Sequence, residues 1–71
     1  MDIKRRFGLA VRARRLALGI SQEELALRID ADQAYVSRVE AGAMNVTLET
    51  AEQLAQALES DVAALFSTAG R

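Results

Sequence analysis

Side chains that could read the edges of DNA bases recur at helical spacing between residues 33 and 41. At about 100° per residue, one face of a helix there would carry Gln33, Ala34, Ser37, Arg38 and Ala41. Glutamine can donate to and accept from adenine, arginine can bind guanine through two parallel hydrogen bonds, and serine can do either. The opposite face would carry the residues that can pack, Tyr35, Val36 and Val39. The segment therefore predicts a helix with one side suited to base edges, although a merely solvated polar face would show the same pattern.

A second helix is expected immediately before this one, with a short connection between them. Ser21 can accept a hydrogen bond from the backbone three residues on while Glu24 reaches back, as in a capping box. Asp30 tolerates the left-handed conformation, and Asp32 can cap the helix that follows. Residues 21–41 thus describe a helix-turn-helix, in which the second helix is held out to enter the major groove of DNA.

Three further helices are expected around this pair. Apolar residues at helical spacing predict a first helix over residues 7–18, which Gly19 can end in the left-handed conformation. Thr47 can cap a fourth helix, and Ser60 or Asp61 can start a short fifth. The predicted fold is therefore all-α, with five helices in one compact domain.

The composition limits the chain to one small domain over residues 1–71 and excludes several kinds of chemistry. The absence of cysteine and histidine excludes disulfides, thiolate or imidazole metal ligands and the commonest general bases. Because no pair of carboxylates converges and no phosphate-binding loop is present, we expect neither an enzyme nor a cofactor. No apolar run could span a membrane and MDIKRRFGLAV lacks the core of a signal peptide, so we expect a cytoplasmic protein without a membrane partner.

Charge is distributed unevenly along the chain, although the net charge is only −1. Residues 1–15 contain six basic residues against one acid, and residues 40–71 contain five acids against one arginine. Such a distribution would turn the first part of the chain toward phosphates and the last part away from them. Residues 1–6 could form a basic arm that touches DNA or simply a solvated end. Arg12 could pair locally or reach a phosphate.

The run FGLAVRARRLALGISQEELALRIDADQAYVSRVEAG, followed by NVTLETAEQLAQALESDVAALF, resembles the Cro and repressor type of helix-turn-helix protein, the xenobiotic-response-element (XRE) family. The resemblance covers residues 7–66, and its specific parts are GISQEELA, YVSRVEAG and LAQALESDVAALF. Within the family the chain is most similar to the small controller proteins of restriction-modification systems, which share the NV(T/S)L entry to the fourth helix. The resemblance implies a lambda-repressor-like fold and sequence-specific binding to double-stranded DNA.

The resemblance also implies roles for particular residues. Gln22 and Gln33 match two glutamines of phage repressors, of which the first binds a phosphate and braces the second against a base. Arg15 and Glu40 match an arginine and a glutamate that pair inside the domain, so we assign them to structure rather than to DNA contact. A further phosphate contact is expected from Asn45 in the loop after the third helix.

Some positions are ambiguous or depart from the family pattern. Tyr35 could pack in the core, or approach DNA as a tyrosine does in controller-like relatives. Asp30 stands where a glycine is usual, and basic or asparagine residues of relatives are replaced by Ala41, Ala43 and Met44. Fewer phosphate charges imply weaker non-specific binding and a shallower dependence of DNA affinity on salt.

A homodimer is expected, because two identical recognition helices on a two-fold axis extend a short half-site into a specific operator. The resemblance places self-association on the fourth and fifth helices, residues 47–66, where the apolar residues exceed what a small core needs: Leu48, Val62, Leu65 and Phe66. These residues could instead complete the core of the monomer.

The leading functional prediction is a dimeric transcriptional regulator that binds an inverted-repeat operator. RNA polymerase is a further candidate partner, through exposed acids such as Glu23 and Glu24. Two alternatives stay open: the antitoxin of a toxin-antitoxin operon that represses its own gene, and a helical interaction module that has lost DNA binding.

Overall fold

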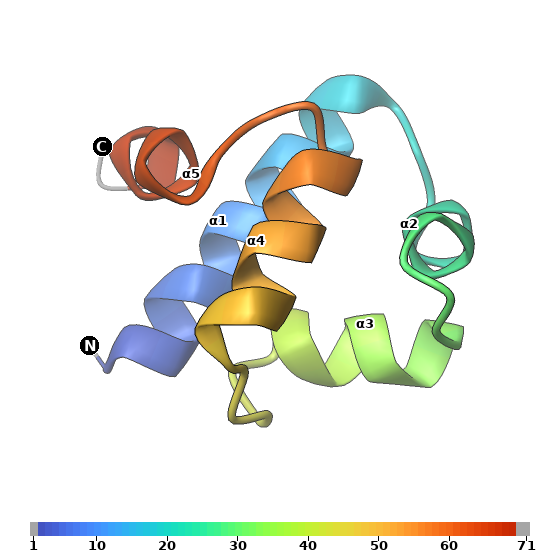
Figure 1. Cartoon of the computed structure of the whole chain (residues 1–71), viewed down its shortest axis with the longest axis horizontal. Helices are drawn as coiled ribbons and strands as arrows, with labels where there is room; N and C mark the ends of the chain where they lie inside the picture. The colour runs from blue at the N-terminus through green and yellow to red at the C-terminus, as the bar shows by residue number, and fades with distance from the viewer. Residues whose placement is uncertain (1, 70–71) are drawn as a thin grey trace.

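The computed structural model describes residues 2–69, and this part of the chain folds into five helices without a β-strand (Figure 1). The helices are α1 (Ile3–Leu18), α2 (Gln22–Arg28), α3 (Gln33–Glu40), α4 (Leu48–Ala57) and α5 (Val62–Ala69). α1 packs against α3 and α5, α2 packs against α3 and α4, and α4 also packs against α5. The prediction of an all-α domain with five helices is therefore confirmed. None of the helices within residues 2–69 is long and apolar enough to cross a lipid bilayer.

Polar side chains begin the first four helices, each by accepting a backbone N–H three residues on. The caps and their distances are Asp2 at 2.8 Å, Ser21 at 3.0 Å, Asp32 at 2.8 Å and Thr47 at 3.1 Å. Each such cap contributes about 1 kcal/mol to helix stability. At the start of α5, Asp61 Oδ1 accepts from the backbone N–H of Ala64 at 2.8 Å. Three of the caps were predicted from the sequence, and Asp61 settles the choice left at the fifth helix.

The beginning of the chain differs from the prediction. The basic residues of the expected arm, Lys4, Arg5 and Arg6, lie in the first turn of α1, because Asp2 caps the helix ahead of them. This turn packs closely on the bend after α3: a Cβ at Gly42 would lie 2.9 Å from the Cα of Arg5. The expectation of a separate arm over residues 1–6 is therefore wrong for the described residues 2–6.

The turn between α2 and α3 spans residues 29–32 and uses a left-handed residue. Asp30 has φ 56°, which is the left-handed conformation that aspartate tolerates. Asp32 caps α3. The capping box at α2 is formed only on one side: Ser21 accepts from the backbone of Glu24, but the Glu24 carboxylate pairs with Arg28 at 3.3 Å. The two helices are thus held in the predicted tight arrangement.

The core lies where the five helices meet, and its buried apolar side chains come from all of them: Phe7, Ala10, Val11, Leu25, Ala26, Val36, Val39, Ala51, Leu54, Ala55, Leu58 and Leu65. A fully buried leucine or valine contributes about 1.5 to 3 kcal/mol through the hydrophobic effect. Gly8 allows α1 to cross the end of α3, since a Cβ there would meet the backbone carbonyl oxygens of Val39 and Glu40. The core therefore fixes α3 against α1 along one side and leaves the other side free.

Two arginines hold the C-terminal end of α4. Arg14 donates from Nε to the carbonyl of Leu58 at 2.8 Å, and Arg28 donates from Nη1 to the carbonyl of Ala57 at 2.9 Å. These carbonyls lack partners within their own helix, and positive charge is favourable at a helix C-terminus. Part of the basic charge of the chain therefore stabilises the fold.

Candidate nucleic-acid interface

α3 presents the predicted polar face to solvent. Figure 1 shows this helix along one edge of the molecule, far from α5. Its buried side consists of Val36 and Val39, which pack in the core, and Tyr35 is half-buried against them. Of the predicted base-reading residues, Gln33, Ala34 and Arg38 are exposed, whereas Ser37 is half-buried. The helix is thus anchored on one side and open on the other.

A buried ion pair joins the end of α3 to α1. Arg15 donates from Nε to Glu40 Oε2 at 2.7 Å and from Nη2 to Oε1 at 3.1 Å, and the two residues are 8% and 9% exposed. The hydrogen bond to Glu40 raises the pKa of Arg15 above its ordinary value, although burial acts in the opposite direction. Arg15 also donates from Nη1 to the carbonyl of Ile20 at 3.0 Å, just before α2. The pair that the resemblance implied therefore ties α1 to α3 and to the segment just before α2.

The same carboxylate orients the two glutamines. Gln22 donates from Nε2 to Glu40 Oε1 at 3.0 Å, and Gln33 donates from Nε2 to Gln22 Oε1 at 2.6 Å. Arg15 has only donors and the carboxylate only acceptors, so Gln22 must point its amino group at Glu40 and its carbonyl at Gln33. Gln33 must then donate. The four residues Arg15, Glu40, Gln22 and Gln33 form a directed chain of hydrogen bonds, the glutamine relay.

The glutamine relay determines what α3 offers to a base. With one amide hydrogen used on Gln22, Gln33 retains its carbonyl oxygen and its second N–H for an outside partner. One acceptor beside one donor complements the N6 amino group and N7 of adenine in the major groove. Because the side chain is already held, less conformational entropy is lost when a base is bound. Sequence reasoning placed the glutamines together but did not foresee that Glu40 would orient them.

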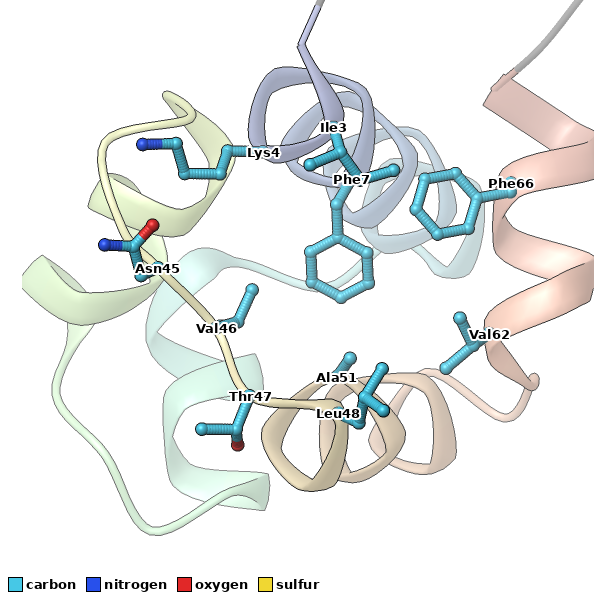
Figure 2. Close-up of a pocket in the computed structure, with 10 residues that line it drawn as sticks. All are labelled: Ile3, Lys4, Phe7, Asn45, Val46, Thr47, Leu48, Ala51, Val62 and Phe66. Atoms are coloured by element: carbon cyan, nitrogen blue, oxygen red, sulfur yellow. The ribbon is translucent and has the colours of Figure 1, made fainter.

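The loop after α3 brings Asn45 beside the start of α1. Figure 2 shows Asn45 and Lys4 extending to the same side of the molecule, away from α5. Both are exposed, and both line the same pocket. An amide and an ammonium group at this end of α3 are suited to a phosphate. Lys4 therefore belongs with Asn45 through its place in α1, and not through an arm.

The rest of this pocket is an apolar groove between α1, α4 and α5, and the whole pocket has a volume of about 320 Å³ (Figure 2). Leu48 is 87% exposed at its rim, and Val62 and Phe66 are half-buried along it. Phe66 packs on Phe7 with ring centroids 5.8 Å apart. Leu65 is only 1% exposed, because it faces inward from α5, so its assignment to a dimer interface is corrected to the core of the monomer.

The fold and the site together define a helix-turn-helix protein in which α3, the second helix of the motif, is anchored for contact with a DNA duplex. The family model for the helix-turn-helix matches residues 11–65, and the chain belongs to this family, of XRE type. Its homologues are controller proteins of restriction-modification systems.

Three relatives show this similarity in sequence and in structure. The control protein C.MunI of Mycoplasma sp. is 39% identical over 67 residues, covering 93% of this chain and 90% of its own length. The restriction-modification controller protein C.AhdI from Aeromonas hydrophila is 41% identical in sequence, and the match covers 86% of this chain and 88% of the C.AhdI chain. Its crystal structure superposes on this one with a TM-score of 0.80. The controller protein C.Esp1396I, solved as a tetramer with its natural 35 base-pair operator, is 25% identical, covers 97% and 91%, and has a TM-score of 0.85.

Proposed function

We propose that this protein is a transcription regulator that binds a specific double-stranded DNA operator, in the manner of a restriction-modification controller protein, and acts by binding rather than by catalysis. The observation that carries the proposal is the glutamine relay, which fixes Gln33 on the exposed side of α3 with a donor and an acceptor directed outward. Such a protein would act in the cytoplasm on an inverted-repeat operator. RNA polymerase would be its further partner if it activates.

Base contacts are assigned to the exposed side of α3. Gln33 would bind adenine, and Arg38, which is exposed near the end of the helix, would bind guanine through two hydrogen bonds. Ala34 leaves room for close approach and can contact a thymine methyl group. Tyr35 is half-buried against the core, which supports packing as its main role. Each good bidentate pair contributes about 1 to 3 kcal/mol of discrimination between bases.

Phosphate contacts are assigned to the residues that flank α3. Gln22 keeps its second amide hydrogen, since only one is used on Glu40, and Asn45 and Lys4 lie together at the other end of the site. These contacts would position α3 in the major groove of the DNA without reading the base sequence. Arg14 and Arg28 are excluded from this set because they bind backbone carbonyls of α4 and its end.

A homodimer is proposed through the apolar groove and the rim beside it. A leucine that is 87% exposed next to a hollow lined by Phe7, Val62 and Phe66 provides a projecting group and a recess on the same surface. A surface of this kind can pair with its own copy about a two-fold axis. Two recognition helices related in this way would read an inverted repeat.

Selection of bound duplexes from a random pool tests this function. The wild type is expected to enrich a two-fold symmetric sequence, and Gln33→Ala and Arg38→Ala are each expected to relax the preference at one position of each half-site. Gln53→Ala, an exposed change on α4, serves as the matched control and should select the wild-type sequence. Failure of the wild type to enrich any sequence at low salt would refute the proposal.

A further inference from the structure

A polar hollow lies beside the glutamine relay, between α1 and α3. Its volume is about 330 Å³, and it is lined by Arg12, Arg15, Gln22, Ser37, Glu40 and Ala41. Ser37 and Ala41 also belong to the outward-facing side of α3 that was predicted to read bases. The hollow therefore opens beside the face on which we place the DNA.

The charge of this polar hollow comes from Arg12. Glu40 would repel an anion, but it accepts three hydrogen bonds, two from Arg15 and one from Gln22, and Arg15 carries the opposite charge. The opposite charges of Arg15 and Glu40 therefore offset each other. Arg12 is exposed, and its side chain makes no hydrogen bond or ion pair within residues 2–69. The alternative that Arg12 pairs locally is thus not what the structure shows, and a guanidinium without a partner stands at the rim.

Ser37 is placed differently from the other polar residues of α3. It is half-buried in the wall of the polar hollow, whereas Gln33 and Arg38 are exposed. Its hydroxyl makes no hydrogen bond within the described part of the chain. Ala41, the C-cap residue that follows α3, adds only a methyl group and leaves the hollow open. A donor that faces this recess is better placed for a phosphate oxygen than for the edge of a base.

We propose that the polar hollow seats one backbone phosphate of duplex DNA, with Arg12 providing the charge and Ser37 and the second N–H of Gln22 providing neutral hydrogen bonds. This inference rests on the proposed function, and it reassigns Ser37 from reading bases to holding the backbone. Because Gln22 also holds Gln33, the seated phosphate would lie next to the base that Gln33 reads. The contact would thereby fix the position of α3 in the major groove of the DNA.

The first test is the salt dependence of operator affinity, measured by fluorescence anisotropy over a series of monovalent salt concentrations. Each neutralised phosphate contributes about 0.9 to the slope of log K against log salt. Arg12→Gln is expected to lower the slope by about 0.9 for each bound copy, and Arg12→Lys to keep it. Arg28→Gln removes the same charge from a residue bound to α4 and should leave the slope unchanged. An unchanged slope for Arg12→Gln would overturn the inference.

The second test identifies the phosphate. Operators in which one phosphate at a time is replaced by a neutral methylphosphonate are titrated with the wild type and with Arg12→Gln. One position in each half-site should weaken binding of the wild type about tenfold, the effect of losing one charged hydrogen bond, and should weaken Arg12→Gln by a clearly smaller factor, because only the neutral contacts of Ser37 and Gln22 remain there. Equal losses for both proteins at every position would show that Arg12 does not hold a phosphate.

The assignment of Ser37 has its own readout. Ser37→Ala should weaken all operator sequences by the same factor and leave the selected sequence unchanged, whereas loss of a base contact would change the preference at one position. A changed preference would therefore return Ser37 to the base-reading set. If the wild type binds no specific DNA, the proposed function fails; if it binds specifically but Arg12→Gln keeps the full salt slope, only the phosphate seat fails.

Discussion

Replacing Glu40 separates what the glutamine relay contributes to stability from what it contributes to DNA binding. In Glu40→Gln the new amide must place an amino group where the carboxylate accepted from Arg15 or Gln22, so at least one of three hydrogen bonds becomes a donor facing a donor. The charge of Arg15, which is 8% exposed, loses its partner. Breaking a buried ion pair from one side costs about 3 to 5 kcal/mol. Because the replacement is nearly isosteric, we expect about 3 kcal/mol.

A paired replacement completes the test. In Arg15→Met with Glu40→Leu no buried charge remains, and exchanging an ion pair for apolar residues of similar volume is often neutral or stabilising. We expect this double variant to recover most of the stability lost by Glu40→Gln. Its DNA affinity should stay low, because Gln22 then has no carboxylate to orient it and Gln33 loses its fixed partner.

The assay is urea unfolding followed by circular dichroism, with operator affinity measured on the same samples. A loss of less than 1 kcal/mol in Glu40→Gln would contradict the account of the buried pair. Wild-type affinity in the stable double variant would contradict the proposed role of the relay, since positioning through Glu40 would then be unnecessary.

Three further predictions follow from the packing and the charges. Gly8→Ala should lower the free energy of unfolding by about 1 to 3 kcal/mol, because the new Cβ would lie 2.7 Å from the carbonyl oxygen of Glu40; unchanged thermal unfolding would contradict this crossing. Leu48→Glu should shift sedimentation toward the monomer without loss of helix, whereas Leu27→Glu, also exposed but outside the apolar groove, should not; equal behaviour of the two would remove the groove from the interface. Folding raises the pKa of Arg15, so its contribution to stability is complete below the ordinary pKa of arginine and is lost only as the pH rises through the pKa of the folded state; the free energies of unfolding of the wild type and of the double variant Arg15→Met with Glu40→Leu should therefore differ by a constant amount from neutral to mildly alkaline pH.

The features that the sequence predicted correctly depend on neighbours along the chain. The caps at Ser21, Asp32 and Thr47 each bond a backbone group three residues on, so residue type and position suffice to find them. The left-handed residue Asp30 in the turn follows from the same local rules. The division of α3 into a buried and an exposed side follows from helical periodicity alone.

The features that sequence reasoning missed depend on how the helices rotate against one another. Arg14 holds the end of α4 across 44 positions of sequence, and no local pattern marks that pairing. Leu48 and Leu65 look alike in an apolar pattern, yet one is 87% and the other 1% exposed. Ser37 and Arg38 are adjacent on α3, and only the position of α1 places Ser37 in the polar hollow. The pairs Arg15 with Glu40 and Gln22 with Gln33 came from resemblance, since residues 25 and 11 positions apart carry no periodic signal.

The most direct test of the account is a coupling measurement between Gln33 and the base that it reads. In the half-site obtained by selection, the adenine assigned to Gln33 is replaced by 7-deazaadenine, which lacks the N7 acceptor and leaves base pairing intact. We expect the wild type to lose about tenfold in affinity on this replacement, the effect of one hydrogen bond of about 1.4 kcal/mol, and Gln33→Ala to lose nothing further. An equal loss for both proteins would show that the amide held by the glutamine relay does not read that base.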